Sequence, residues 1–344
     1  MEKQTNVKRR NFLKGASAGI GLSIASTSGF ANASEKNERE KLPREVWIAS
    51  LTLQGLEARS MDEMVRKVIG RMEQTLPCHP DIICLPEAFP YKGVPDAPPD
   101  SEIAETIPGP IVERFAIFAK NHHCNVICPM SAKENGLVYN SAVVIDRKGK
   151  VLGAFHKIHP TVGEIESGVT PGPIDPPVFQ TDFGTIGIQI CFDINWHDGW
   201  RRLRKKGAEI IFWPSAFPGG RMLNGLAWMT KCCIVSSTWP DPCRIIDITG
   251  DEIASSGRFE HWICAPVNLE KAFIHIWPYT QNLDDLRAKY GQKVRITKMH
   301  LEDWAIVESV SADVKLVEVL KEFEIPIHEE HIQRAEQAQD KLRL

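Results

Sequence analysis

Gly187-Ile188-Gln189-Ile190-Cys191-Phe192-Asp193 places a thiol at the end of an apolar run and directly before a polar turn. The run predicts a buried β-strand that ends at the cysteine, with a helix after the turn. Functional groups of α/β proteins gather at such strand ends, and backbone N–H groups of the turn face the same space. Cys191 is therefore a candidate nucleophile, although a single cysteine is more often a buried structural residue.

Two charged side chains stand at comparable positions. Lys157 closes the β-rich segment 153–157, and Glu87 closes the apolar segment 82–87. A thiol with an ordinary pKa of about 8.5 is mostly protonated at neutral pH, so a reactive cysteine needs a base or a cation beside it. Glu87 and Lys157 are candidates for these roles, although either residue taken alone is more often a surface charge at the end of a strand.

From residue 46 onward the chain alternates between predicted strands and helices. Short β-rich runs predict strands, and apolar residues at helical spacing predict helices. Strands are expected at 46–51, 81–85, 125–129, 209–213 and 233–237, hairpins at 138–157, 178–191 and 245–255, and helices at 60–76, 111–121, 199–206 and 221–231. This pattern predicts an α/β protein with two similar halves.

Taken together, the motifs resemble those of the nitrilase superfamily of carbon–nitrogen hydrolases. The resemblance runs from about Val46 to Glu270, and its glutamate, lysine and cysteine motifs occur in the family's order. They read LPEAF at 85–89, HKIHPT at 156–161 and QICFD at 189–193, followed by GAEII at 207–211 and WPSAF at 213–217. The resemblance implies a four-layer α-β-β-α sandwich and assembly as a homodimer or larger homo-oligomer.

The resemblance also implies a mechanism. Cys191 attacks an amide-like carbon, and Lys157 and the backbone N–H of Phe192 hold the oxyanion. Glu87 acts as base and acid through a thioester intermediate, and Glu164 corresponds to the family's second glutamate, which positions the lysine and the substrate. Neither a metal nor an organic cofactor is implied.

The sequence departs from the family pattern after the cysteine. Residues 195–198 read NWHD where many relatives carry an aromatic residue followed by Pro and Glu. Asp198 is expected to cap the next helix. Asn195, Trp196 and Phe217 are expected near the substrate pocket, although Trp196 is as readily a packing residue. The substrate class stays open among amides, N-carbamoyl compounds and nitriles, with the amide side favoured.

The first 33 residues have the shape of an export signal. A basic segment containing Arg9 and Arg10 precedes an apolar run rich in small residues, which ends at Ala31-Asn32-Ala33. This order resembles a twin-arginine signal and predicts an exported, periplasmic protein. We expect a linker at 34–44, the hydrolase domain at 45–277 and a more polar, interface-forming extension at 278–344 with little apolar face of its own. No membrane-spanning segment is expected in the mature chain.

Composition excludes several classes. The chain is 43% hydrophobic and 25% charged, as globular proteins are, and its net charge of −3 lacks the basic excess of a nucleic-acid binder. Nine cysteines, none in a C-x-x-C pair, argue against a disulfide framework or a zinc site. His328 and His331 share one face of an expected helix, which is interpreted as solvated rather than metal-binding. A small-molecule partner is expected.

Two alternatives share these residues. A non-catalytic relative would keep the sandwich as a binding or assembly scaffold. An acyltransferase would pass the thioester to an amine instead of water.

Overall fold

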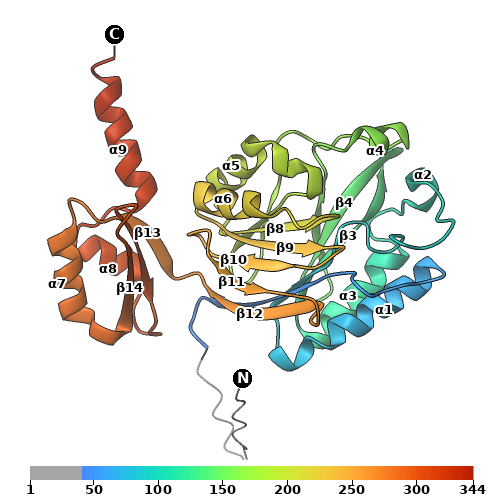
Figure 1. The fold of residues 1–344 in the computed structure, drawn as a ribbon, viewed down its shortest axis with the longest axis horizontal. Helices are drawn as coiled ribbons and strands as arrows, with labels where there is room; N and C mark the ends of the chain where they lie inside the picture. The colour runs from blue at the N-terminus through green and yellow to red at the C-terminus, as the bar shows by residue number, and fades with distance from the viewer. Residues whose placement is uncertain (1–40, 344) are drawn as a thin grey trace, which may run out of the picture. The chain divides into compact units, whose positions relative to one another are not determined.

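The computed structural model describes residues 41–343. The signal predicted at 1–33 and most of the linker at 34–44 lie outside these residues. The described residues contain two six-stranded sheets and one three-stranded sheet, with helices packed against them (Figure 1). None of its helices is long and apolar enough to cross a membrane.

The first large sheet contains the two strands that lead into the glutamate and lysine motifs. Its order is β12-β1-β2-β3-β4-β5. The strands are β1 (Glu45–Leu51), β2 (Ile82–Cys84), β3 (Asn125–Glu134), β4 (Leu137–Ile145), β5 (Val151–His156) and β12 (Trp262–Asn268). β1, β2 and β3 are parallel, whereas β3, β4 and β5 form an antiparallel meander.

The second large sheet leads to the cysteine motif. Its order is β11-β10-β9-β8-β7-β6. The strands are β6 (Val178–Gln180), β7 (Thr185–Ile188), β8 (Ile210–Ser215), β9 (Cys233–Thr238), β10 (Arg244–Ile246) and β11 (Glu252–Ser255). The central strands β7, β8 and β9 are parallel, so their carboxyl ends meet at one edge.

Alternating side chains on the strands separate the layers. On β8, Ile210 and Phe212 face a core shared by both sheets, whereas Ile211 and Trp213 face the helices α5 (His197–Lys205) and α6 (Arg221–Thr230). On β2, Ile82 and Cys84 face the shared core and Ile83 faces α1 (Met61–Glu73) and α3 (Pro110–His122). The four-layer α-β-β-α sandwich is therefore confirmed, because residues one apart on a strand point to opposite faces.

Short helices mark the turns near the strand ends. They are the 3₁₀ helices η1 (Leu76–Cys78) and η2 (Cys191–Asn195) and the α-helices α2 (Asp100–Ile103) and α4 (Val162–Glu166). The sequence predicted a strand up to Cys191, but β7 ends at Ile188 and Cys191 begins η2. Asp198 was expected to cap α5. That expectation is wrong, because the N-cap is Trp196 and Asp198 lies inside the first turn.

The C-terminal residues form a small unit with its own sheet, of order β13-β15-β14. Its elements are β13 (Lys271–His275), α7 (Thr280–Tyr290), η3 (Gly291–Lys293), β14 (Val294–Met299), β15 (Trp304–Ser309), α8 (Leu316–Glu322) and α9 (His328–Asp340). Leu283, Leu286, Val307 and Val319 belong to an apolar core separate from those of the sandwich. The expectation that this segment has little apolar face of its own is therefore wrong.

The histidines of α9 are partly exposed and pack against other aromatic rings. His328 packs against Trp304 with ring centroids 4.3 Å apart, and His331 stacks on His275 at 5.0 Å. Among the described residues, no group of three or more His, Cys, Asp or Glu side chains is arranged to hold a metal ion.

Candidate active site

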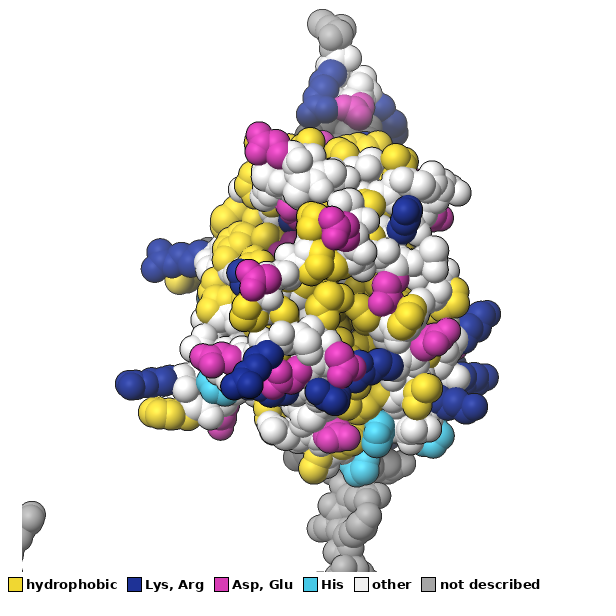
Figure 2. Space-filling model, turned by 90° about the vertical axis from the view of Figure 1, so that its right-hand side faces the viewer, with side chains coloured by type: hydrophobic (Ala, Val, Ile, Leu, Met, Phe, Trp, Pro, Cys, Tyr) yellow, Lys and Arg dark blue, Asp and Glu magenta, His cyan; other side chains and the backbone are white. Residues whose placement is uncertain are grey.

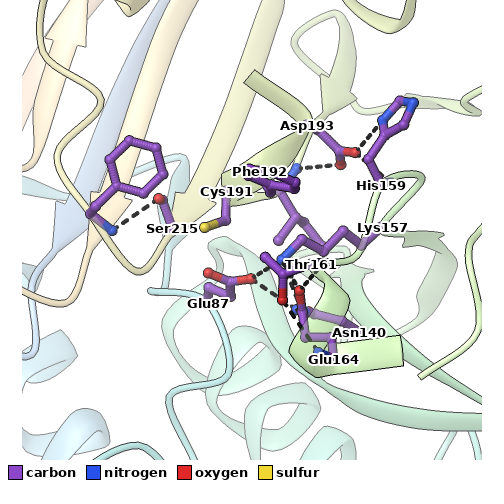
Figure 3. A network of polar contacts seen from close by, with 12 residues as sticks. Glu87, Asn140, Lys157, His159, Thr161, Glu164, Cys191, Phe192, Asp193 and Ser215 are labelled. Atoms are coloured by element: carbon purple, nitrogen blue, oxygen red, sulfur yellow. Dashed lines mark hydrogen bonds and ion pairs between the residues drawn. The ribbon is translucent and has the colours of Figure 1, made fainter. Parts of the chain in front are cut away.

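Three segments from two sheets bring the predicted residues together. Glu87 follows β2, Lys157 follows β5 and Cys191 follows β7, and all three line one pocket of about 420 Å³. Figure 3 shows Glu87 and Lys157 pointing toward each other, with the sulfur of Cys191 on the Glu87 side of the group. The site therefore depends on the stacking of the two sheets.

Glu87 and Lys157 form a buried ion pair. The Lys157 Nζ lies 2.8 Å from Glu87 Oε1, and the side chains are 2% and 4% exposed. Asn140 Nδ2 donates to the same oxygen at 2.8 Å. The other oxygen, Oε2, is buried and has no hydrogen-bond partner among residues 41–343. A buried polar atom without a partner is costly, so this orphaned oxygen calls for a functional explanation.

Glu164 joins the ion pair from the other side. Its two carboxylate oxygens each lie 2.9 Å from Lys157 Nζ, and Oε1 also accepts from Asn140 Nδ2 at 2.8 Å. A capping box fixes the side chain, because the Thr161 backbone N–H donates to Glu164 Oε2 at 2.7 Å while the Thr161 hydroxyl accepts from the Glu164 N–H. The start of α4 thus orients one of the two acids beside the ammonium.

These acids keep Lys157 protonated. Burial lowers the pKa of Lys157, but the charges of Glu87, Cys191 and Glu164 outweigh burial and raise it above its ordinary value of 10.5. At neutral pH Lys157 is an ammonium, which can stabilise negative charge but has no free lone pair to act as a base.

Cys191 sits in a sharp turn. Its φ of +45° lies in the left-handed region, which is uncommon for a residue with a side chain. The Trp213 indole N–H donates to the Cys191 carbonyl at 3.1 Å and helps to hold the turn. The strained backbone puts the sulfur at the pocket instead of in the sheet.

Burial raises the pKa of the Cys191 thiol to about 12, and the nearby Glu87 carboxylate adds to this, while Lys157 and hydrogen bonds from Ala216 and Ser215 oppose it. Before any substrate binds, the thiol is therefore protonated at neutral pH. A reaction at this sulfur needs a group that takes the proton.

Asp193 connects the turn after β7 to the segment after Lys157. Its fully buried carboxylate accepts from the Ile190 N–H at 3.0 Å and from the His159 backbone N–H and Nδ1 at 2.8 Å each. These contacts fix the position of Cys191 relative to the lysine loop.

This geometry agrees with the comparison of the sequence with protein families. The family model for carbon-nitrogen hydrolases matches residues 48–232. The chain belongs to the carbon-nitrogen hydrolase family. The resemblance to the nitrilase superfamily is thereby confirmed.

Curated relatives of this carbon-nitrogen hydrolase are similar over part of their length. Beta-ureidopropionase of Arabidopsis thaliana is 30% identical over 40% of the chain and 36% of its own length. The omega-amidase of Xenopus tropicalis is 32% identical over 40% of the chain and 51% of its own length. Citrullinase of Francisella tularensis is 27% identical over 46% of the chain and 65% of its own length. The match thus spans about a third of the first of these relatives.

Solved structures share the fold. An amidase from Nesterenkonia sp. superposes with a TM-score of 0.57 at 15% identity, covering 65% of this chain and 90% of the amidase. Saccharomyces cerevisiae Nit3, a member of branch 10 of the nitrilase superfamily, gives 0.58 at 16% identity, covering 75% of this chain and 97% of Nit3. At such identities the likeness concerns the fold alone.

The expected pocket residues of this hydrolase lie elsewhere. Asn195, Trp196 and Phe217 are not among the residues that line the pocket with Cys191. The Asn195 amide donates to the Phe192 carbonyl, Trp196 stacks on His159 with ring centroids 4.0 Å apart, and Phe217 packs edge-on against Trp213. Asn195 and Trp196 thus pack around the turn that carries Cys191, and Phe217 packs beyond the end of β8.

Sequence reasoning missed other lining residues. They are Ala88, Tyr91, Lys92, Gly93, Asp100, Asn140, Thr161, Ala216 and Trp239. Asn140 was detectable in principle, because the predicted 138–157 hairpin pairs β4 with β5 and sets Asn140 opposite Lys157, where Lys157 N donates to the Asn140 carbonyl at 2.8 Å. Trp239 follows β9 and had no signal of its own, because only the packing of the sheets brings it to Glu87.

The pocket lies beside α2 and α4, on the right in Figure 1. Figure 2 views the molecule from this side. Apolar side chains gather in the middle of this face, and charged side chains of both signs surround them.

Proposed function

We propose that this protein hydrolyses a small amide or N-carbamoyl compound at Cys191, with Glu87 as general base and acid and Lys157 as the cation that stabilises the oxyanion. The observation that carries the proposal is the buried Glu87 Oε2, which has no hydrogen-bond partner and belongs to the pocket that Cys191 lines. A protonated thiol needs a base, and this oxygen has a free lone pair with which to accept the proton.

In the first step the sulfur of Cys191 forms a bond to the carbonyl carbon while its proton passes to Glu87. The new oxyanion is met by the Lys157 ammonium and by the backbone N–H of Phe192. Phe192 is the second residue of η2, and the first N–H groups of a helix have no acceptor within it. Glu87 then protonates the departing nitrogen, the C–N bond breaks and a thioester remains.

In the second step Glu87 takes a proton from water as the water oxygen bonds to the thioester carbon. The C–S bond breaks, the proton returns to sulfur and a carboxylic acid leaves. Glu164 holds the ammonium throughout, so that one lysine can serve both tetrahedral intermediates.

The amide and carbamoyl classes are favoured over nitriles by the relatives. Proteins named beta-ureidopropionase, citrullinase and omega-amidase are similar to this chain. In one structure of the Nesterenkonia amidase, acrylamide has added to the active-site cysteine. A nitrile would require addition of the thiolate to a triple bond and two waters.

The test is trapping of the intermediate. Wild type, Glu87→Gln, Cys191→Ala and the control Cys78→Ala, which alters a partly exposed thiol outside the pocket, are incubated with panels of amides, N-carbamoyl compounds and nitriles. Ammonia or amine release and intact mass are measured. Wild type and Cys78→Ala are expected to turn over, and Glu87→Gln is expected to retain an acyl mass on Cys191 because deacylation stalls.

Other outcomes decide between the alternatives. Release of product by Cys191→Ala at the wild-type rate contradicts the proposed nucleophile. No turnover and no adduct with any compound supports the non-catalytic scaffold. Formation of a hydroxamate in place of acid when hydroxylamine is added at low concentration supports an acyltransferase, and turnover of nitriles alone supports a nitrilase.

Two further proposals concern the whole chain. We propose that residues 1–33 direct export through the twin-arginine route, which is tested by fractionating cells that express wild type or an Arg9→Lys, Arg10→Lys variant. Cytoplasmic retention of the variant alone is expected. We also propose a homodimer or larger homo-oligomer, to be tested by light scattering, and a purely monomeric protein would contradict it.

A further inference from the structure

The pocket contains a lysine that the proposed reaction does not use. The loop between β2 and α2 contributes Glu87 to the pocket and, farther along, Lys92. Lys92 is exposed at the pocket and does not contact the buried ion pair of Glu87 and Lys157. Its role is therefore separate from the bond-breaking steps.

An indole ring determines where the Lys92 ammonium lies. Lys92 Nζ is 3.8 Å from the centroid of the Trp239 ring, a cation–π contact. Trp239 also lines the pocket, and its indole N–H donates to the backbone carbonyl of Glu87. The ammonium is thus held against a ring that is itself fixed to the backbone of the proposed base.

In the described part of the chain, no acid pairs with the Lys92 ammonium. Among residues 41–343, Lys92 forms no ion pair and donates no side-chain hydrogen bond, although surface lysines of this chain such as Lys67 and Lys289 pair with acids. The face of an aromatic ring attracts a cation without using up its N–H donors. Lys92 therefore has donors left for a ligand in the pocket.

The pocket wall also contains an acid, and its carboxylate already accepts a hydrogen bond. Asp100 also lines the pocket, but its carboxylate accepts from the Ser131 hydroxyl, which in turn contacts the Tyr91 hydroxyl at 2.5 Å. The hydroxyl groups of Ser131 and Tyr91 thus hold the Asp100 side chain in place in the pocket wall. Hydroxyl groups do not cancel the charge of a carboxylate, so the wall presents an acid, Asp100, and an ammonium, Lys92, and Lys92 is the one that can donate to an anionic group of a ligand.

We infer that Lys92 binds a carboxylate of the substrate, so that this enzyme acts on amides or N-carbamoyl compounds that carry an anionic group at the end remote from the scissile bond. The inference rests on the proposed function, because it concerns the same pocket. A pocket of about 420 Å³ suits a small molecule whose two ends contact Cys191 and Lys92 at once. A carboxylate also fits the ammonium in charge and hydrogen bonding.

The kinetic test compares substrates that differ only in the remote charge. Succinamate and its neutral methyl ester are assayed with wild type, Lys92→Gln, Lys92→Glu and the control Lys120→Gln, a change to a lysine outside the pocket. Lys92→Gln is expected to lower kcat/KM for succinamate about 10-fold or more and to leave the ester within about twofold, since a hydrogen bond to a charged group is lost. Lys92→Glu is expected to prefer the ester, and Lys120→Gln to match wild type.

A second readout needs no turnover. Iodoacetate and iodoacetamide both alkylate a thiol. Like the two substrates, they differ in charge, because iodoacetate has a carboxylate where iodoacetamide has a neutral amide. Mass spectrometry follows alkylation of Cys191 by each reagent. The rate with iodoacetate divided by the rate with iodoacetamide is expected to fall about 10-fold in Lys92→Gln and to stay unchanged in Lys120→Gln.

The two readouts separate the two failures. If the ratio of alkylation rates and the preference among substrates are the same in Lys92→Gln as in wild type, the carboxylate site is overturned while the hydrolase stands. If no amide or carbamoyl compound is turned over but the alkylation ratio falls in Lys92→Gln, the proposed function fails and the anion site stands.

Discussion

At the residue scale, the two oxygens of Glu87 differ in surroundings. Oε1 is occupied by Lys157 and Asn140, whereas the buried Oε2 is free. One oxygen thus anchors the carboxylate and the other is available to the thiol. The same negative charge opposes formation of a thiolate at Cys191, because it adds to the effect of burial in raising the pKa of the thiol to about 12. Proton transfer and attack are therefore coupled.

Glu87→Gln is expected to separate these two effects. Turnover should fall about 10²- to 10⁴-fold, because general acid and base catalysis is lost. The pKa of Cys191 should fall, because the carboxylate that raised it is gone while the Lys157 cation remains. The pH profile of alkylation by iodoacetamide should therefore move to lower pH. A profile that is unchanged or moves upward contradicts the assigned electrostatics.

Glu164 links the site to stability in acid. Burial raises the pKa of Glu164, but Lys157 and hydrogen bonds from Asn140 and Thr161 outweigh burial, so that it lies below its ordinary value of 4.5. A lowered carboxyl pKa contributes stability above the unfolded-state pKa, and this contribution is lost as pH falls through the folded-state value. The stabilisation is therefore complete at neutral pH.

We expect Glu164→Gln to be less stable than wild type near neutral pH. The difference should begin to shrink below about pH 4.5, where the carboxyl of the unfolded chain becomes protonated, and should disappear as pH falls through the lower pKa of the folded protein. Urea unfolding at pH values from about 7 to about 3.5 measures the difference. Glu166→Gln, on the same helix, is the control and should track wild type. A constant deficit over the whole range excludes the charge as its cause.

At the element scale, two short helices determine the geometry of the site. η2 positions the Cys191 thiol, and α4 positions Glu164 through its capping box. Neither is long enough to be stable from helix propensity alone. Their geometry comes from hydrogen bonds to buried groups such as Asp193. We therefore expect a change at a helix cap to alter the contacts of the Lys157 ammonium.

Thr161→Ala is expected to reduce both stability and activity. Loss of the cap should cost about 0.5–2 kcal/mol, and the released Glu164 carboxylate should lower kcat several-fold by loosening its hold on Lys157. Thr161→Ser keeps the hydroxyl that accepts from Glu164 N and is expected to restore both. Chemical denaturation and steady-state kinetics measure the two effects. Equal kcat in the alanine and serine variants would show that α4 does not transmit the cap to the site.

At the scale of the whole molecule, the sandwich and the C-terminal unit have separate apolar cores but share ion pairs. Arg204 on α5 contacts Glu329 on α9 at 2.6 Å, and Lys271 on β13 contacts Asp247 at 2.8 Å. None of the residues that line the pocket with Cys191 belongs to the C-terminal core. Damage to that core should therefore leave the chemistry largely intact.

Leu283→Ala tests this separation. Leu283 is fully buried in the C-terminal core, so the cavity should cost about 2–5 kcal/mol. Hydrogen exchange should rise in residues 280–325 and remain as in wild type across β7, β8 and β9, with kcat unchanged at low temperature. The same substitution at Leu226, which lies on α6 and packs in the sandwich core, is the comparison and should affect the sandwich. A loss of kcat in Leu283→Ala alone would show that the small unit supports the site.

Most of the sandwich was predictable, because each strand or helix has a local pattern. The continuous apolar run along 210–213 indicates a strand buried on both faces, and the helical spacing along 60–76 indicates a helix that buries one face. Neighbouring residues reveal both patterns. The sheet of the C-terminal unit was not predicted, because the polar composition of this segment hides the apolar faces that β14 and β15 bury with α7 and α8.

The sequence by itself determined the family, the α/β alternation and the identity of the glutamate, lysine and cysteine at three strand ends, because motifs and periodicity are local properties of the chain. Only the tertiary structure decided which side chains share a pocket. The stacking of two sheets brought Trp239, Lys92 and Asn140 to the candidate site and kept Trp196 and Phe217 away. Contacts between residues far apart in sequence depend on packing geometry, which no single segment encodes.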